Sequence, residues 1–145
     1  MNRLRRTLLA ALAFAMARPL AALAAWNKEA FSAKTPGDAL KNLGIAGAAP
    51  SKELHIEAPE IAENGAVVPI EVSSAIAGTS ALIVVIEKNP FPLTARFDFK
   101  EGALPFVKLN VKMAETSDVR VLAEAAGKHY FATKEIKVTI GGCGG

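Results

Sequence analysis

From Glu53 onward, apolar side chains recur at every second residue, and this period of two restricts what the chain can fold into. Such alternation is typical of β-strands with one buried face. Turn-forming residues separate six runs of this kind, at 53–57, 67–72, 93–99, 107–113, 119–124 and 130–140, and a seventh run, at 81–86, is apolar throughout. Short strands at this spacing predict an antiparallel β-sandwich of the immunoglobulin-like type over residues 53–140.

Two of these runs also indicate where their strands lie in the sandwich. Pro69 has no N–H to donate, so the run at 67–72 is predicted to be an edge strand. The run from Ala81 to Ile86 is aliphatic without a break, which predicts a strand covered on both faces. The mainly β fold class therefore rests on seven runs, of which one is expected at an edge and one in the interior.

The first 24 residues have the order of an export signal peptide. The segment begins with three arginines, which are followed by an apolar run from Leu8 to Ala17 and then by small residues at 22–24. The mature chain is therefore expected to begin near Ala25, outside the cytoplasm. The adjacent pair Arg5-Arg6 favours the twin-arginine route, with an ordinary secretory signal as the alternative. The apolar run is about half the roughly 20 residues of a membrane-spanning helix, so no membrane anchor is expected.

Residues 25–52 lie between the signal and the predicted sandwich. Helix-forming residues at 28–33 and 38–43, interrupted by Thr35-Pro36-Gly37, predict a short helical segment in two pieces. The stretch at 45–51 is rich in Ala, Gly and Pro and predicts a linker. We therefore expect the body of the protein to start with short helices that a linker joins to the strands.

The single cysteine, Cys143, follows the last predicted strand. Its neighbours are four glycines: Gly141, Gly142, Gly144 and Gly145. Glycines offer no side chain that could bury the thiol, so residues 141–145 predict a flexible, slender arm. When extended at about 3.3–3.6 Å per residue, this arm carries Cys143 roughly 10 Å beyond Ile140. The pattern favours an exposed thiol on a tether.

An unpaired cysteine in an exported protein is free, modified or bonded to another molecule. Cys143 could carry a substrate covalently, or it could join this chain to a partner through an inter-chain disulfide as a structural immunoglobulin-like subunit. Nucleophilic catalysis would need a nearby cation, helix N-terminus or histidine. His129 is fourteen residues away, His55 lies on another predicted strand, and both are expected at the surface. The chain is therefore predicted to be a carrier and not an enzyme, with no catalytic residue of its own.

Other classes of site are not expected. Two histidines and one cysteine at these spacings do not make a zinc or copper site, and we predict neither a metal nor another cofactor. The carboxylates of Glu57, Glu60 and Glu63 are expected to form a solvated face around a turn. Without residues 1–24 the chain has 13 basic and 14 acidic residues, a net charge of about −1, so no nucleic-acid binding is expected.

The C-terminal sequence Val-Thr-Ile-Gly-Gly-Cys-Gly-Gly at 138–145 resembles the SoxY family, the sulfur carriers of the periplasmic thiosulfate-oxidising Sox system. The segment from Pro59 to Pro69 is similar to a hairpin of that family, and the segment from Glu87 to Pro92 is similar to its central Asn-Pro segment. The predicted export signal at residues 1–24 also agrees with this family. The resemblance covers about residues 53–145 and is weakest over 25–52.

This resemblance implies that Cys143 carries thiosulfate as an S-thiosulfonate and passes it among separate enzymes. In the family, a haem c cytochrome attaches the substrate oxidatively and a manganese-dependent sulfohydrolase releases sulfate. A molybdenum-containing sulfane dehydrogenase then oxidises the remaining sulfur. The carrier pairs with SoxZ, a second immunoglobulin-like protein, so a heterodimer is expected. Only Cys143 and its glycines carry over as functional positions.

The sequence also offers apolar surface that such a partner could cover. The aliphatic run at 82–86, the apolar rim of the Asn-Pro-Phe-Pro break that follows it and the predicted edge strand at 67–72 are expected to be incompletely covered within one domain. We therefore predict that this chain forms a stable heterodimer and is poorly soluble alone.

Overall fold

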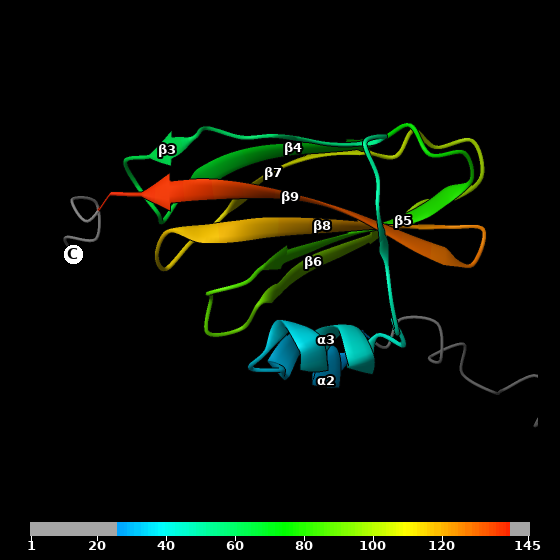
Figure 1. Cartoon of the computed structure of the whole chain (residues 1–145), viewed down its shortest axis with the longest axis horizontal. Coiled ribbons are helices and arrows are strands. Elements are labelled where there is room, and N and C mark those ends of the chain that lie inside the picture. The colour runs from blue at the N-terminus through cyan, green and yellow to red at the C-terminus, as the bar shows by residue number, and fades with distance from the viewer. Residues whose placement is uncertain (1–25, 140–145) are drawn as a thin grey trace, which may run out of the picture.

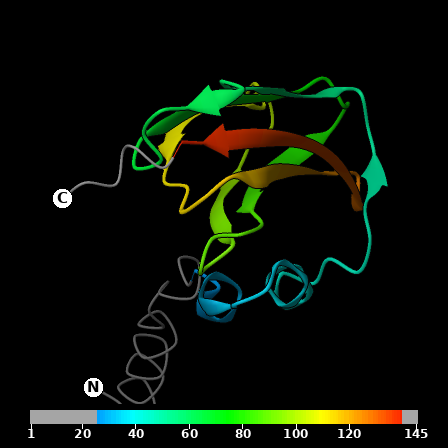
Figure 2. The same ribbon diagram turned by 60° about the vertical axis from the view of Figure 1, so that its left-hand side comes forward.

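The computed structural model describes residues 26–139, which form two β-sheets and two short helices (Figures 1 and 2). The mainly β, immunoglobulin-like sandwich predicted from the sequence is confirmed. The predicted runs form strands β2 (Leu54–Glu57), β4 (Val68–Ser74), β5 (Thr79–Ile86), β6 (Leu93–Asp98), β7 (Phe106–Val111), β8 (Ser117–Ala125) and β9 (Lys128–Val138). Strands β1 (Ala49–Pro50) and β3 (Ile61–Ala62) have two residues each and are too short to show a period of two.

The larger sheet has the strand order β1-β9-β8-β5-β6, and β3 pairs with a different part of β9. The smaller sheet has the order β2-β4-β7. The pairs among the longer strands are antiparallel, as predicted, whereas β1 and β3 both run parallel to β9. The turn after β3 leads into β4, so the segment from Pro59 to Pro69 connects the two sheets and is not a hairpin of neighbouring strands.

Strand β5 is buried on both faces, as its aliphatic sequence predicts. Leu82 and Val84 belong to the main core between the sheets, whereas Ile83 and Val85 belong to a second core on the outer face of the larger sheet. All four side chains are completely buried. The run at 82–86 is therefore covered within this chain, and our expectation that it leaves apolar surface for a partner is wrong.

The helical segment supplies the cover for the outer face of the larger sheet. Helices α2 (Lys28–Ser32) and α3 (Pro36–Asn42) lie against this face, on the side away from the smaller sheet (Figure 1). The Asn27 side chain accepts a hydrogen bond from the backbone N–H of Ala30, and Thr35 caps α3 in the same way. Ala30 and Ala39 are fully buried in the second core. The predicted helices are thus confirmed and pack against the sheet.

The predicted edge position of the run at 67–72 is wrong. β4 is the middle strand of the smaller sheet, between β2 and β7. The ladder with β2 extends only from Glu71 to Ser74, so Pro69 lies beyond the end of β2. On its other side Pro69 pairs in register with Asn110 of β7. A central strand tolerates proline here because its neighbour is too short to need the missing N–H.

We predict that substitutions on either face of β5 destabilise the protein to a similar extent. Leu82→Ala empties space in the main core and Ile83→Ala empties space in the second core, so each should lower the free energy of unfolding by about 2–5 kcal/mol. Chemical denaturation measures both values. The control Ile61→Ala removes a side chain that is 57% exposed and should change stability by about 0.5 kcal/mol. An Ile83→Ala effect as small as that of the control would contradict the second core.

Candidate functional site

The described residues end at Thr139, so Cys143 and the glycines Gly141, Gly142, Gly144 and Gly145 lie outside them. The part of the site that the structure describes is the point from which the arm leaves. We call Val138 and Thr139 the arm root. In Figure 1 the arm root lies at the end of β9, beside β3 and opposite the turn that joins β8 to β9.

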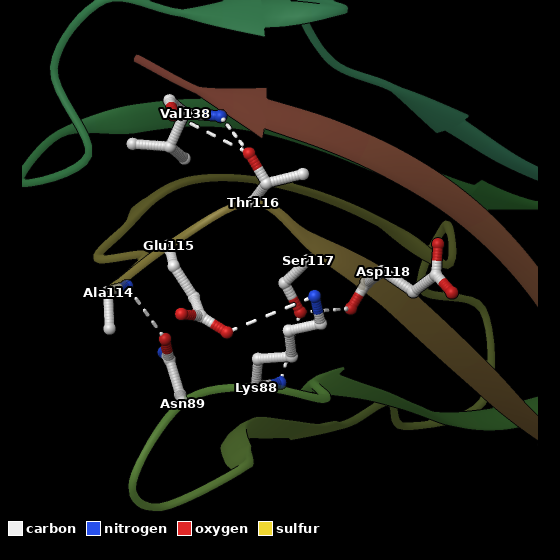
Figure 3. A network of polar contacts seen from close by, with 8 residues as sticks. All are labelled: Lys88, Asn89, Ala114, Glu115, Thr116, Ser117, Asp118 and Val138. Carbon is white, nitrogen blue, oxygen red and sulfur yellow. Dashed lines mark hydrogen bonds and ion pairs between the residues drawn. The ribbon is translucent and has the colours of Figure 1, made fainter. Parts of the chain in front are cut away.

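Hydrogen bonds to its backbone hold the arm root from both sides. On one side, the N–H of Val138 donates to Thr116 Oγ1 at 2.9 Å, and the Thr116 hydroxyl donates to the Val138 carbonyl at 3.5 Å (Figure 3). On the other side, the N–H of Thr139 donates to the carbonyl of Ala62 in β3 at 3.1 Å. β9 is therefore paired up to the last described residue, which fixes the origin of the arm relative to the sandwich.

The turn between β3 and β4 packs directly on the arm root, and only glycine fits at its centre. A Cβ atom on Gly65 would lie 2.5 Å from the carbonyl oxygen of Met113 and 2.9 Å from Cγ1 of Val138. The Gly65 carbonyl accepts a hydrogen bond from the N–H of Met113 at 2.7 Å. The Asn64 side chain accepts from the N–H of Ala66 at 2.9 Å and orders the same turn.

Asn89 holds the loop that carries Thr116 to the arm root. Its Nδ2 donates to the carbonyl of Lys112 at 2.7 Å. Its Oδ1 accepts from the N–H of Ala114 at 3.0 Å, as Figure 3 shows. The neighbouring N–H of Lys88 donates to the hydroxyl of Ser117, a buried side chain. The loop is thus fastened just before and just after Thr116.

These anchoring residues were not found by sequence reasoning. The Asn-Pro pair at 89–90 marked the end of a strand, and an asparagine there often bonds to nearby backbone, which was a usable signal. Gly65 belonged to a recognised turn, but only the fold shows that Met113 and Val138 approach it. Thr116 carried no signal, because its partner lies 22 residues further along the chain.

The histidines lie away from the arm root. His55 is exposed on β2, and His129 is near the start of β9, about 30 Å from Val138 at the usual rise of a strand. The His129 side chain is 19% exposed, with Nε2 3.9 Å from a carboxylate oxygen of Glu124. His55 is therefore at the surface as predicted, and His129 is half-buried.

The ion pairs of Arg96 and Lys108 also lie away from the arm root. Arg96 contacts Asp98 at 2.8 Å and Glu124 at 3.1 Å on the outer face of the larger sheet. Burial lowers the pKa of Arg96, but its hydrogen bonds and ion pairs with these carboxylates outweigh burial, so that the pKa is raised overall. The pKa of Lys108 is raised by its hydrogen bond with Glu71. These ion pairs lie on β6 and β8 in the larger sheet and on β4 and β7 in the smaller sheet, and none of them involves the arm root.

The carboxylates at the predicted turn are solvated. Glu57, Glu60 and Glu63 are all exposed, as expected. Within residues 26–139, no group of three or more His, Cys, Asp or Glu side chains is placed to hold a metal ion. In the same part of the chain, none of the helices has the length and apolar character needed to cross a membrane.

The fold and site define a class of protein: an immunoglobulin-like β-sandwich whose last strand is anchored on both sides where a C-terminal extension begins. A family model described as "Sulfur oxidation protein SoxY" matches residues 41–143. The chain therefore belongs to the SoxY family, as its C-terminal sequence suggested. The matched range includes Cys143 as its last residue.

A solved structure supports the same assignment. The sulfur carrier protein SoxY from Chlorobium limicola f thiosulfatophilum is 38% identical to this chain, with a TM-score of 0.66. The match covers 72% of this chain and 96% of that one. No curated protein matches the chain.

We predict that Thr116→Val loosens the arm root without unfolding the sandwich. The valine has a similar shape but cannot accept the hydrogen bond from Val138, which is worth about 0.5–1.5 kcal/mol. Hydrogen exchange of the Val138 amide should therefore accelerate by about two- to twelvefold. The matched control Thr94→Val removes a hydroxyl on β6 that bonds to Pro92, and it should leave Val138 unchanged. Equal exchange in both variants would show that Thr116 does not hold the root.

Proposed function

We propose that this protein is a covalent sulfur carrier of thiosulfate oxidation, with Cys143 as its attachment site and no catalytic activity of its own. Family membership and the similarity to a solved sulfur carrier support the carrier role. The observation that carries the proposal is the arm root, where the sandwich fastens the chain up to Thr139, two residues before a glycine-rich segment with one thiol. This arrangement is suited to a thiol that presents a bound sulfur group to other proteins.

The proposed chemistry leaves the reactive steps to the enzymes. In loading, the Cys143 sulfur and the outer sulfur of thiosulfate form an S–S bond, the thiol loses its proton, and an electron pair passes to the haem c cytochrome. In release, the manganese-dependent sulfohydrolase uses water to cleave off the sulfonate as sulfate, and a persulfide stays on Cys143. The molybdenum-containing sulfane dehydrogenase then oxidises that remaining sulfur.

The anchored arm root limits how far the thiol can travel. Cys143 is four residues beyond Thr139, so a fully extended chain places it at most about 14 Å away. A short tether keeps the sulfur group at a high effective concentration near one end of the sandwich. An enzyme that acts on the group must therefore approach that end, and a loose root would enlarge the volume that the thiol samples.

We further propose a heterodimer with a SoxZ-like subunit in the periplasm, where the predicted export signal at 1–24 would deliver the chain. Among the described residues, β6 and β7 each pair on one side only. Because β2 packs against β9 and β8, the strand orders bring these two free edges to the same side of the sandwich. The inward-facing Phe97, Val107 and Leu109 remain only partly buried there. Free edges beside incompletely covered apolar side chains suit a second β-subunit.

The opposite side of the sandwich is better closed. The Lys134 ammonium donates a hydrogen bond to the carbonyl of Ala58 at 2.7 Å, and β1 and β3 cover parts of β9. We therefore predict that the mature chain aggregates when produced alone and forms a soluble heterodimer when produced with a SoxZ-like protein. Size-exclusion chromatography with light scattering distinguishes the two states. A monodisperse monomer at high concentration would contradict the proposed pairing.

The attachment site and the arm can be tested separately. Cys143→Ser should abolish loading with sulfur and leave the melting temperature unchanged, because the residue lies beyond the last strand. The double variant Gly142→Val/Gly144→Val keeps the thiol but widens and stiffens the arm. It should react normally with a small alkylating agent, while turnover by the partner enzymes falls about tenfold or more.

Assays of loading, alkylation and thiosulfate oxidation report these effects. Wild-type turnover by the valine variant would show that the glycines do not serve access. Normal loading of Cys143→Ser would remove Cys143 from the mechanism. A permanent disulfide between Cys143 and another chain would instead support the structural-subunit function.

A further inference from the structure

Two exposed apolar side chains stand beside the arm root. Ile61 on β3 is 57% exposed, and Val67, directly before β4, is 55% exposed. They flank the turn whose Gly65 packs against Val138. We call Ile61 and Val67 the collar.

Backbone contacts of β3 and of the turn that follows it hold the collar in place. Ile61 pairs in register with Lys137 of β9, and the N–H of Val67 donates to the Asn64 carbonyl at 3.3 Å. The neighbouring side chains of Ala62 and Val68 are buried in the main core. Because successive residues of an extended chain face opposite sides, Ile61 and Val67 are directed outward. Their exposure follows from the fold.

The length of the arm determines what can cover the collar. The N–H of Thr139 bonds to the Ala62 carbonyl at 3.1 Å, so the arm starts one residue away from Ile61 in the neighbouring strand. With a reach of at most about 14 Å from Thr139, Cys143 cannot enter a channel in another protein unless that protein's surface closes on the end of the sandwich. The rim of such a channel would then meet the collar.

The charges around the collar do not favour a rim of either sign. Glu60, Glu63, Lys112 and Lys137 are all exposed on the elements next to it, two acidic and two basic. Because these charges balance, they give little electrostatic steering of a partner protein. Apolar side chains that become buried contribute to binding whatever the charge of the partner. The surface is therefore suited to an uncharged, apolar partner surface.

We propose that the collar is the docking surface for the enzymes that process Cys143, and that these enzymes present an apolar rim around the channel that takes the arm. This inference rests on the proposed carrier function and adds the place and chemistry of the contact. Several enzymes can bind such a surface in turn, because binding requires only that each enzyme has an apolar rim around a channel of suitable depth.

The test uses the mature chain in its heterodimer, loaded with thiosulfate and supplied to the manganese-dependent sulfohydrolase at increasing concentrations. In the variant Ile61→Ser/Val67→Ser, KM for the loaded carrier should rise about tenfold while kcat stays within about twofold, because docking weakens and the bound arm is unchanged. The single variant Ile61→Ser should show a smaller rise. Raising the salt concentration should change KM of the wild type little.

The matched control is Leu104→Ser, which removes an apolar side chain that is 84% exposed in the loop before β7, away from the arm root. Its KM should equal that of the wild type. An unchanged KM in the double variant, or a steep salt dependence of the wild type, would overturn the apolar collar. Faster alkylation of Cys143 in the double variant would show that the collar covers the arm itself and would equally overturn it. If the wild type is not a substrate, the carrier function fails as well.

Discussion

The burial of β5 on both faces is the constraint on which the rest of this structure depends. Its aliphatic side chains need cover from the smaller sheet on one face and from α2 and α3 on the other. Leaving Ile83 and Val85 exposed would cost about 1.5–3 kcal/mol for each side chain. β8 pairs with β5 and contributes to both cores, and β9 pairs with β8. The strand that carries the arm is thus tied to the most deeply buried part of the protein.

A few hydrogen bonds connect this stable core to the arm root at the end of β9. Asn89 holds the loop before Thr116, Thr116 holds Val138, and β3 holds Thr139 from the other side. Gly65 lets the turn after β3 close over the same place. β9 is therefore held in place up to the last described residue. A carrier needs both this fixed strand and the short segment that follows, because the strand positions the segment and the segment delivers the group.

The period of two and the unbroken aliphatic run predicted the sandwich and the interior strand, because both patterns follow directly from which faces are buried. The edge position inferred from Pro69 failed, since a proline shows only that one N–H is missing and not how far the neighbouring strand extends. β3 and the contacts of Thr116 were not predictable, because they depend on how distant segments meet. The candidate attachment site, Cys143, was recognisable by its glycine neighbours and family resemblance, and it lies outside the described residues.

The central claim is that a thiol at the end of an anchored strand carries sulfur. The most direct measurement is the intact mass, with peptide mapping, of the protein purified without reductant from cells that grow on thiosulfate. We predict sulfur and thiosulfonate adducts on Cys143 that a reductant removes. A single population with an unmodified thiol, or one permanently disulfide-bonded to another protein, would contradict the carrier function.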